Sequence, residues 1–109
     1  MVENLAKNLY RIIIPLPNSP LKDLNSYVIK GGDRNLIIDT GFNRTVCYEA
    51  MQQGLNELAI DLNRTDFMLT HMHADHTGLV ERLATDSSRI FFSRIDSQVF
   101  DEENSWQPL

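Results

Sequence analysis

The sequence His71-Met72-His73-Ala74-Asp75-His76 holds all three histidines of the chain within six consecutive positions. Imidazole nitrogens and carboxylate oxygens are the ligands through which proteins bind zinc-like ions. Three histidines spread at random over 109 residues would seldom fall so close together. A His-x-His-x-Asp-His run is also far more restrictive than a two-ligand motif. The stretch therefore predicts a metal site, the alternative being histidines on a polar surface loop.

The spacing of these residues favours a strand end over a helix. Residues 66–70 form a short apolar run after a polar turn, which is typical of a buried strand. His71 and His73 follow, and side chains two positions apart on an extended backbone point to the same side. Asp75 and His76 come as the chain turns, so they can reach a second point nearby. One segment can thus supply ligands to two neighbouring metals.

Composition indicates one domain over residues 1–109, with 42% hydrophobic and 23% charged residues. The net charge of -5 and the pI of about 5.0 do not indicate nucleic acid as a partner, although they do not exclude it. The sequence has no apolar run long enough to span a membrane and no signal-peptide pattern, so we expect no membrane contact and a cytoplasmic protein. The single cysteine, Cys47, excludes an intramolecular disulfide and is expected to be a buried, inert thiol.

Hydrophobic periodicity predicts an alternation of strands and helices. We expect strands at 9–14, 24–30, 35–38, 66–70 and 89–92, and helices at 45–59, around Leu79, Val80 and Leu83, and from Ser93 onward. Asn43 or Thr45 is expected to cap the first helix. The order predicts an α/β (α+β) layer with helices on at least one sheet face. Sites in such sheets lie beyond the carboxyl ends of strands, where Asp39 and the histidine segment both fall.

Three stretches resemble the metallo-β-lactamase superfamily. Residues 70–78 are similar to its metal-binding signature, residues 36–41 to its strand ending in Asp-x-Gly, and residues 25–29 to its early hairpin. The resemblance implies an αββα sandwich. Only its N-terminal αβ half, with a mixed sheet and flanking helices, is expected in this chain.

The resemblance also implies a site and a chemistry. His71 and His73 would bind a first metal, and Asp75 and His76 a second. Asp75 would also orient the attacking water. Asp39 would lie behind the ligands and hold the site's geometry, unless it is only a turn-forming aspartate. The ions are usually Zn²⁺, with iron or manganese as alternatives, and the reaction is hydrolysis of a small-molecule thioester, lactam, lactone or phosphodiester.

One departure from the family pattern limits this interpretation. The complete family site also needs a third histidine on the first metal, a bridging aspartate and a further histidine, and no histidine follows His76 here. We expect the chain to be the N-terminal part of a longer domain, inactive alone, with an uncovered sheet face that could form a homodimer. The alternatives are an iron-dependent oxygenase of the same fold and a non-catalytic metal-binding or dimerising fragment.

Overall fold

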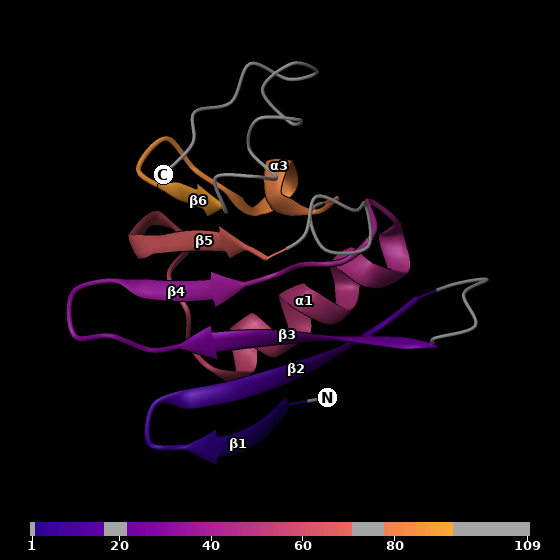
Figure 1. Cartoon of the computed structure of the whole chain (residues 1–109), viewed down its shortest axis with the longest axis horizontal. Coiled ribbons are helices and arrows are strands. Elements are labelled where there is room, and N and C mark those ends of the chain that lie inside the picture. The colour runs from indigo at the N-terminus through magenta and orange to yellow at the C-terminus, as the bar shows by residue number, and fades with distance from the viewer. Residues whose placement is uncertain (1, 17–21, 71–77, 93–109) are drawn as a thin grey trace.

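The protein is described by a computed structural model for residues 2–16, 22–70 and 78–92. Six strands form a single sheet whose spatial order follows the chain, β1-β2-β3-β4-β5-β6 (Figure 1). The strands are β1 (Val2–Ala6), β2 (Leu9–Pro15), β3 (Asp23–Ile29), β4 (Asn35–Ile38), β5 (Thr65–Leu69) and β6 (Ile90–Phe92). The helices are α1 (Thr45–Glu57), a 3-10 turn η1 (Leu62–Arg64) and α3 (Val80–Leu83).

The relative direction of neighbouring strands changes in the middle of the sheet. From β1 to β4 each neighbouring pair is antiparallel, as a meander of short turns requires. From β4 to β6 the pairs are parallel. The connections that contain α1 and then α3 bring the chain back to the end of the sheet where the preceding strand began, so the next strand runs in the same direction. The predicted mixed sheet with flanking helices is therefore confirmed.

Strand alternation places the core on one face of the sheet. In β2, Ile12 and Ile14 are fully buried while their neighbours are only partly covered. Both described α-helices contribute to the same core cluster, so both cover this face (Figure 1). The cluster consists of Ile12, Ile14, Val28, Ile37, Cys47, Met51, Leu55, Leu58, Phe67, Leu79, Val80 and Leu83.

A glycine allows α1 to lie close against β2. A Cβ added at Gly54 would come within 2.8 to 3.0 Å of three side-chain atoms of Ile12. A larger residue at position 54 would therefore push the helix away from the sheet or force Ile12 to move. This close contact fixes the distance between α1 and the sheet that it covers.

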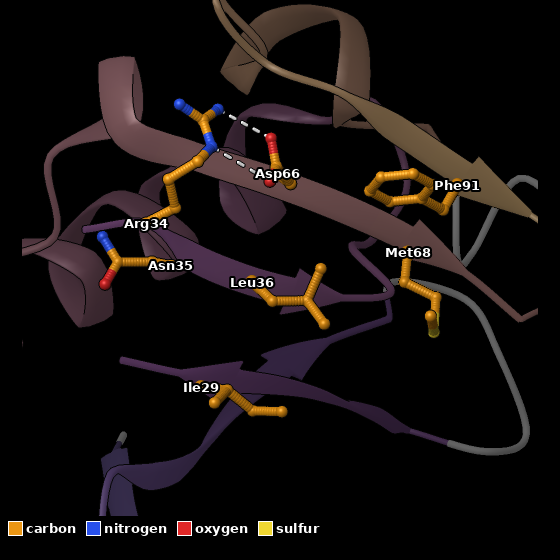
Figure 2. Close-up of a pocket in the computed structure, with 7 residues that line it drawn as sticks. All are labelled: Ile29, Arg34, Asn35, Leu36, Asp66, Met68 and Phe91. Atoms are coloured by element: carbon orange, nitrogen blue, oxygen red, sulfur yellow. Dashed lines mark hydrogen bonds and ion pairs between the residues drawn. The ribbon is translucent and has the colours of Figure 1, made fainter. Parts of the chain in front are cut away.

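The opposite face carries a hollow of about 410 Å³. Its lining consists of Ile29, Arg34, Asn35, Leu36, Asp66, Met68 and Phe91. Figure 2 shows the apolar side chains lying across four strands, with the Arg34–Asp66 pair at one end. Among the residues that the structure describes, no helix lies over this face, as expected for half of a two-sheet sandwich.

Most expected elements are present, with small differences at their ends. The strand at 35–38 matches β4, and the helix expected at 45–59 ends at Glu57. The expected cap is wrong, because Arg44 occupies the N-cap position of α1 and its side chain makes no capping hydrogen bond. The first strand, β1, was not predicted, because a Glu-Asn pair interrupts its apolar residues. The helix expected from Ser93 lies outside the described residues.

Candidate metal centre

The carboxyl ends of β4 and β5 lie side by side in the sheet. These strands are parallel and in register, with Ile38 opposite Met68. The Asp39 amide donates to the Met68 carbonyl at 2.9 Å, so the pairing continues one residue beyond β4. Asp39 and Thr70 therefore leave the sheet as neighbours, which is where a site in such a sheet is expected.

Asp39 holds Thr70 with both of its carboxylate oxygens. The Thr70 amide donates to Oδ1 at 2.8 Å, and the Thr70 hydroxyl donates to Oδ2 at 2.6 Å. Asp39 is only 7% exposed, so these charge-assisted bonds form in a partly desolvated setting. The carboxylate thus fixes the backbone of the residue directly before His71.

The conformation of Asp39 matches this contact. Its φ of 62° lies in the left-handed region, which aspartate tolerates better than most residues do. The buried Ser26 hydroxyl donates to the Asp39 carbonyl at 2.7 Å and stabilises that turn from β3. Asp39 is therefore a turn-forming aspartate that also accepts from Thr70, and its role behind the metal ligands stays a prediction.

The two residues after Asp39 press the β4–α1 connection onto the core. Thr40 is fully buried. A Cβ added at Gly41 would lie 2.8 Å from the Cγ2 of Ile14 and 3.3 Å from the Cβ of Cys47. The glycine of the Asp-Thr-Gly sequence is thus required for close packing. This connection is packed on the core beside the end of β5.

The chain that follows the histidine segment packs into the core through α3 (Val80–Leu83). Leu79, Val80 and Leu83 are all at most 2% exposed, as the sequence predicted. On the outer side of α3, the Arg82 guanidinium lies 3.8 Å from the centroid of the Tyr48 ring in α1. Segment 71–77 is therefore bounded by Thr70, bonded to Asp39, and by a helix buried in the core.

The predicted ligands, His71, His73, Asp75 and His76, lie outside the described residues. Within the described ranges, no group of three or more His, Cys, Asp or Glu residues could hold a metal ion. The chemistry of the proposed donor set fits Zn²⁺, which takes imidazole nitrogen and carboxylate oxygen in tetrahedral sites. Asp39 fits the supporting role, because both of its oxygens accept hydrogen bonds from Thr70.

Sequence reasoning missed an ion cluster around the buried carboxylate of Asp66, at the other end of β5. Asp66 is 5% exposed and accepts from Arg34 Nη2 at 2.7 Å and from Arg89 Nη2 at 2.9 Å. These hydrogen bonds, led by those from Arg34, hold the pKa of Asp66 well below its ordinary range. The sequence feature that could have indicated the cluster was an aspartate near the start of an otherwise apolar strand. The cluster lies at the opposite end of the strand from Thr70, so its role is to join β4, β5 and β6.

Cys47 is the buried thiol that its helical position predicted. It is fully buried, and its Sγ donates to the Pro15 carbonyl at 3.0 Å. Burial raises the pKa of the Cys47 thiol, which disfavours the thiolate needed for nucleophilic attack or metal binding.

Comparison with known proteins agrees with the fold. The family model described as metallo-beta-lactamase superfamily matches residues 21–87. The chain belongs to the metallo-beta-lactamase superfamily. A metallo-beta-lactamase family protein from Thermus thermophilus superposes with a TM-score of 0.73 at 30% identity, over 84% of this chain and 30% of that one.

Among curated relatives, lactamase-like protein adaB of Aspergillus niger is 32% identical over 95 residues, which is 83% of this chain and 29% of that protein. Atrochrysone carboxyl ACP thioesterase nsrC of Aspergillus novofumigatus is 32% identical over 83 residues, 75% of this chain and 25% of that protein. The chain thus spans less than a third of the length of these relatives. No helix in the described ranges is long and apolar enough to cross a membrane.

Proposed function

We propose that this chain carries the first half of a metal-dependent hydrolase site, with His71 and His73 binding one ion and Asp75 and His76 binding a second. The observation that supports this most directly is the Asp39–Thr70 contact, which fixes the backbone entering the histidine segment at the carboxyl ends of two parallel strands. Metal-ligand segments need such support, because hydrogen bonds behind the ligands set their geometry.

The proposed roles of the protein's own residues follow from this arrangement. Asp39 orients the strand end, and His71 and His73 leave it on the same side of an extended backbone. Asp75 binds metal and positions a water for attack. When bound, such an ion supplies Lewis acidity, which lowers the pKa of a water and polarises the bond to be cleaved.

A thioester is the first substrate class to test. Two relatives, nsrC and a protein of Claviceps purpurea, are named atrochrysone carboxyl ACP thioesterases. Lactams, lactones and phosphodiesters are the alternative small-molecule substrates to assay beside the thioester. The cytoplasmic location stays a prediction.

Four ligands shared between two ions leave each with two, whereas a stable zinc site takes three or four. We therefore propose that the remaining ligands come from outside these 109 residues, either from further sequence or from a second copy. The hollow lined by Leu36 and Met68 fits either source, because an open apolar surface can be covered by further sequence or by a second copy.

Native mass spectrometry with metal analysis tests the metal assignment. If a second copy completes the site, the wild-type chain should bind Zn²⁺, and this metal should be lost in the His71→Ala, His73→Ala double variant, with the fold kept by circular dichroism. A metal-free wild-type chain would place the remaining ligands in further sequence. An unchanged metal content in that variant would refute the assignment. Bound iron together with oxygen consumption would favour an oxygenase, and a metal-loaded species without any hydrolysis would favour the non-catalytic alternative.

A further inference from the structure

A buried serine in β3 lies on the face of the sheet that carries the apolar core. Ser26 is fully buried, and strand alternation puts it on the same face as Val28, a member of the core cluster. A hydroxyl in such a place costs free energy unless it is hydrogen-bonded. Ser26 donates to the Asp39 carbonyl at 2.7 Å. The serine therefore has a specific partner at the end of the neighbouring strand.

The Ser26 hydroxyl acts where the pairing of β3 with β4 ends. The last pair of that ladder is Tyr27 with Ile38. The next position would pair Ser26 with Asp39, but the φ of 62° at Asp39 turns the chain out of the extended conformation. A buried carbonyl that leaves a ladder needs another donor. The Ser26 side chain supplies that donor.

The turn at Asp39 decides where its carboxylate points. In a continued strand, alternation would direct this side chain to the same face as Ile37, into the apolar core beneath α1. A charged group among apolar side chains is strongly unfavourable. In the left-handed conformation both carboxylate oxygens instead accept from Thr70. The contact with β5 thus depends on the conformation of Asp39.

We propose that Ser26 is a positioning residue that selects the left-handed conformation of Asp39 and thereby brings the Asp39 carboxylate to Thr70. It joins the ends of three strands, β3, β4 and β5, which lie side by side in the sheet (Figure 1). The importance of this link for catalysis rests on the proposed function. The link itself is made by described residues and does not require a metal.

Amide hydrogen exchange of the full chain, followed by NMR in metal-free buffer, tests this role. The exchange rate of the Thr70 amide is divided by that of the Met51 amide, in the middle of α1, which reports general stability. We expect Ser26→Ala to raise this ratio about 10- to 100-fold, because the turn loses a buried hydrogen bond and releases the Thr70 amide. Ser26→Thr keeps the hydroxyl and should keep the ratio close to that of the wild type.

Thr65→Val is the matched control. Thr65 is also fully buried, and its hydroxyl donates to a backbone carbonyl, that of Asp61, at 2.8 Å, but it lies at the other end of β5. Its loss should destabilise the chain without changing the ratio of the Thr70 and Met51 rates. An equal rise of the ratio in Thr65→Val would show a general effect and would overturn the inference.

The Asp39→Gly background tests whether Ser26 acts through Asp39. Glycine adopts a positive φ without strain, so the turn is kept while the carboxylate is removed. The Thr70 amide should exchange faster in this variant, and adding Ser26→Ala should raise the rate ratio no further. A full further rise in the double variant would mean that Ser26 acts on Thr70 by another route, which contradicts the proposal.

A wild-type ratio in Ser26→Ala, or a Thr70 amide without protection in the wild-type chain, would also overturn it. If Ser26→Ala does not fold, Ser26→Cys gives the same readout. Its weaker S–H donor should raise the ratio by a smaller factor, and an unchanged ratio there would reject the role. Because no metal is needed, failure of the metal assignment in the His71→Ala, His73→Ala test leaves these rates unchanged. A negative exchange result in turn rejects only the role of Ser26.

Discussion

Asp39 and Thr70, 31 residues apart in sequence, are joined by two hydrogen bonds, one from the Thr70 amide and one from its hydroxyl. One carboxylate thus fixes both the backbone and the side chain of the residue before the histidine segment. These two hydrogen bonds hold together the carboxyl ends of the neighbouring parallel strands β4 and β5.

Removal of the Asp39 carboxylate should weaken metal binding more than it weakens the fold. We expect Asp39→Ala to raise the Zn²⁺ dissociation constant about 10- to 100-fold, the usual effect of losing a residue that supports metal ligands. Thr70→Val, which loses only the hydroxyl bond, should have a smaller effect. Asp61→Ala is the control, because Asp61 also accepts from a backbone amide but lies in the turn before β5. Wild-type affinity in Asp39→Ala would contradict the supporting role.

The Asp66 cluster should make stability fall in acid. Because its folded pKa is depressed, the ionised carboxylate stabilises the fold above its ordinary pKa of 3.8. That contribution is lost as the pH drops below this value toward the folded pKa. Urea unfolding at about pH 7 and about pH 3 should show the loss in the wild type. Asp66→Asn should cost about 1–3 kcal/mol at neutral pH and remove this part of the pH dependence, whereas Asp86→Asn, at an exposed position, should leave it unchanged.

The open sheet face should drive self-association. We expect sedimentation velocity to show a dimer of the chain, and Leu36→Lys or Met68→Lys to shift it toward monomer, because each places a charge in the apolar hollow. Leu5→Lys changes an exposed apolar residue outside the hollow, 43% exposed in β1, and should not alter the dimer. A monomeric wild type would rule out the homodimer.

The Cys47 thiol should be protected in the native state. It is fully buried and its pKa is raised by burial, so a thiol reagent at neutral pH should modify it at least about a hundred-fold more slowly than in denaturant. Rapid modification of the folded chain would show that α1 separates readily from β2.

The sequence alone predicted the elements whose period was clear. Strand β4 and helix α1 follow from an unbroken apolar run and from a helical stripe that includes Cys47 and Met51. Strand β1 was missed, because as an edge strand half exposed to solvent it has little apolar pattern. The capping prediction failed because the Asn43 side chain bonds Arg82 and the buried face of α1 outweighs the missing cap.

In the candidate site, too, the sequence predicts local features but not contacts between distant residues. A compact ligand motif is visible in sequence, because its residues are neighbours in the chain. The contact of Asp39 with Thr70, and that of Arg82 with Tyr48, depend on strand register and on helix docking. Neither can be obtained from spacing along the chain, and the strong pairing of Asp66 with two arginines was hidden for the same reason.

The sheet order β1-β2-β3-β4-β5-β6 has a consequence for how the protein is made. Neighbouring strands in the sheet are also consecutive in the chain. Each strand can therefore pair with the strand synthesised before it, without a partner from later in the sequence. Asp39, Ser26 and the β4–α1 connection are all synthesised before Thr70. The acceptor for Thr70 can therefore be in place before the histidine segment is synthesised.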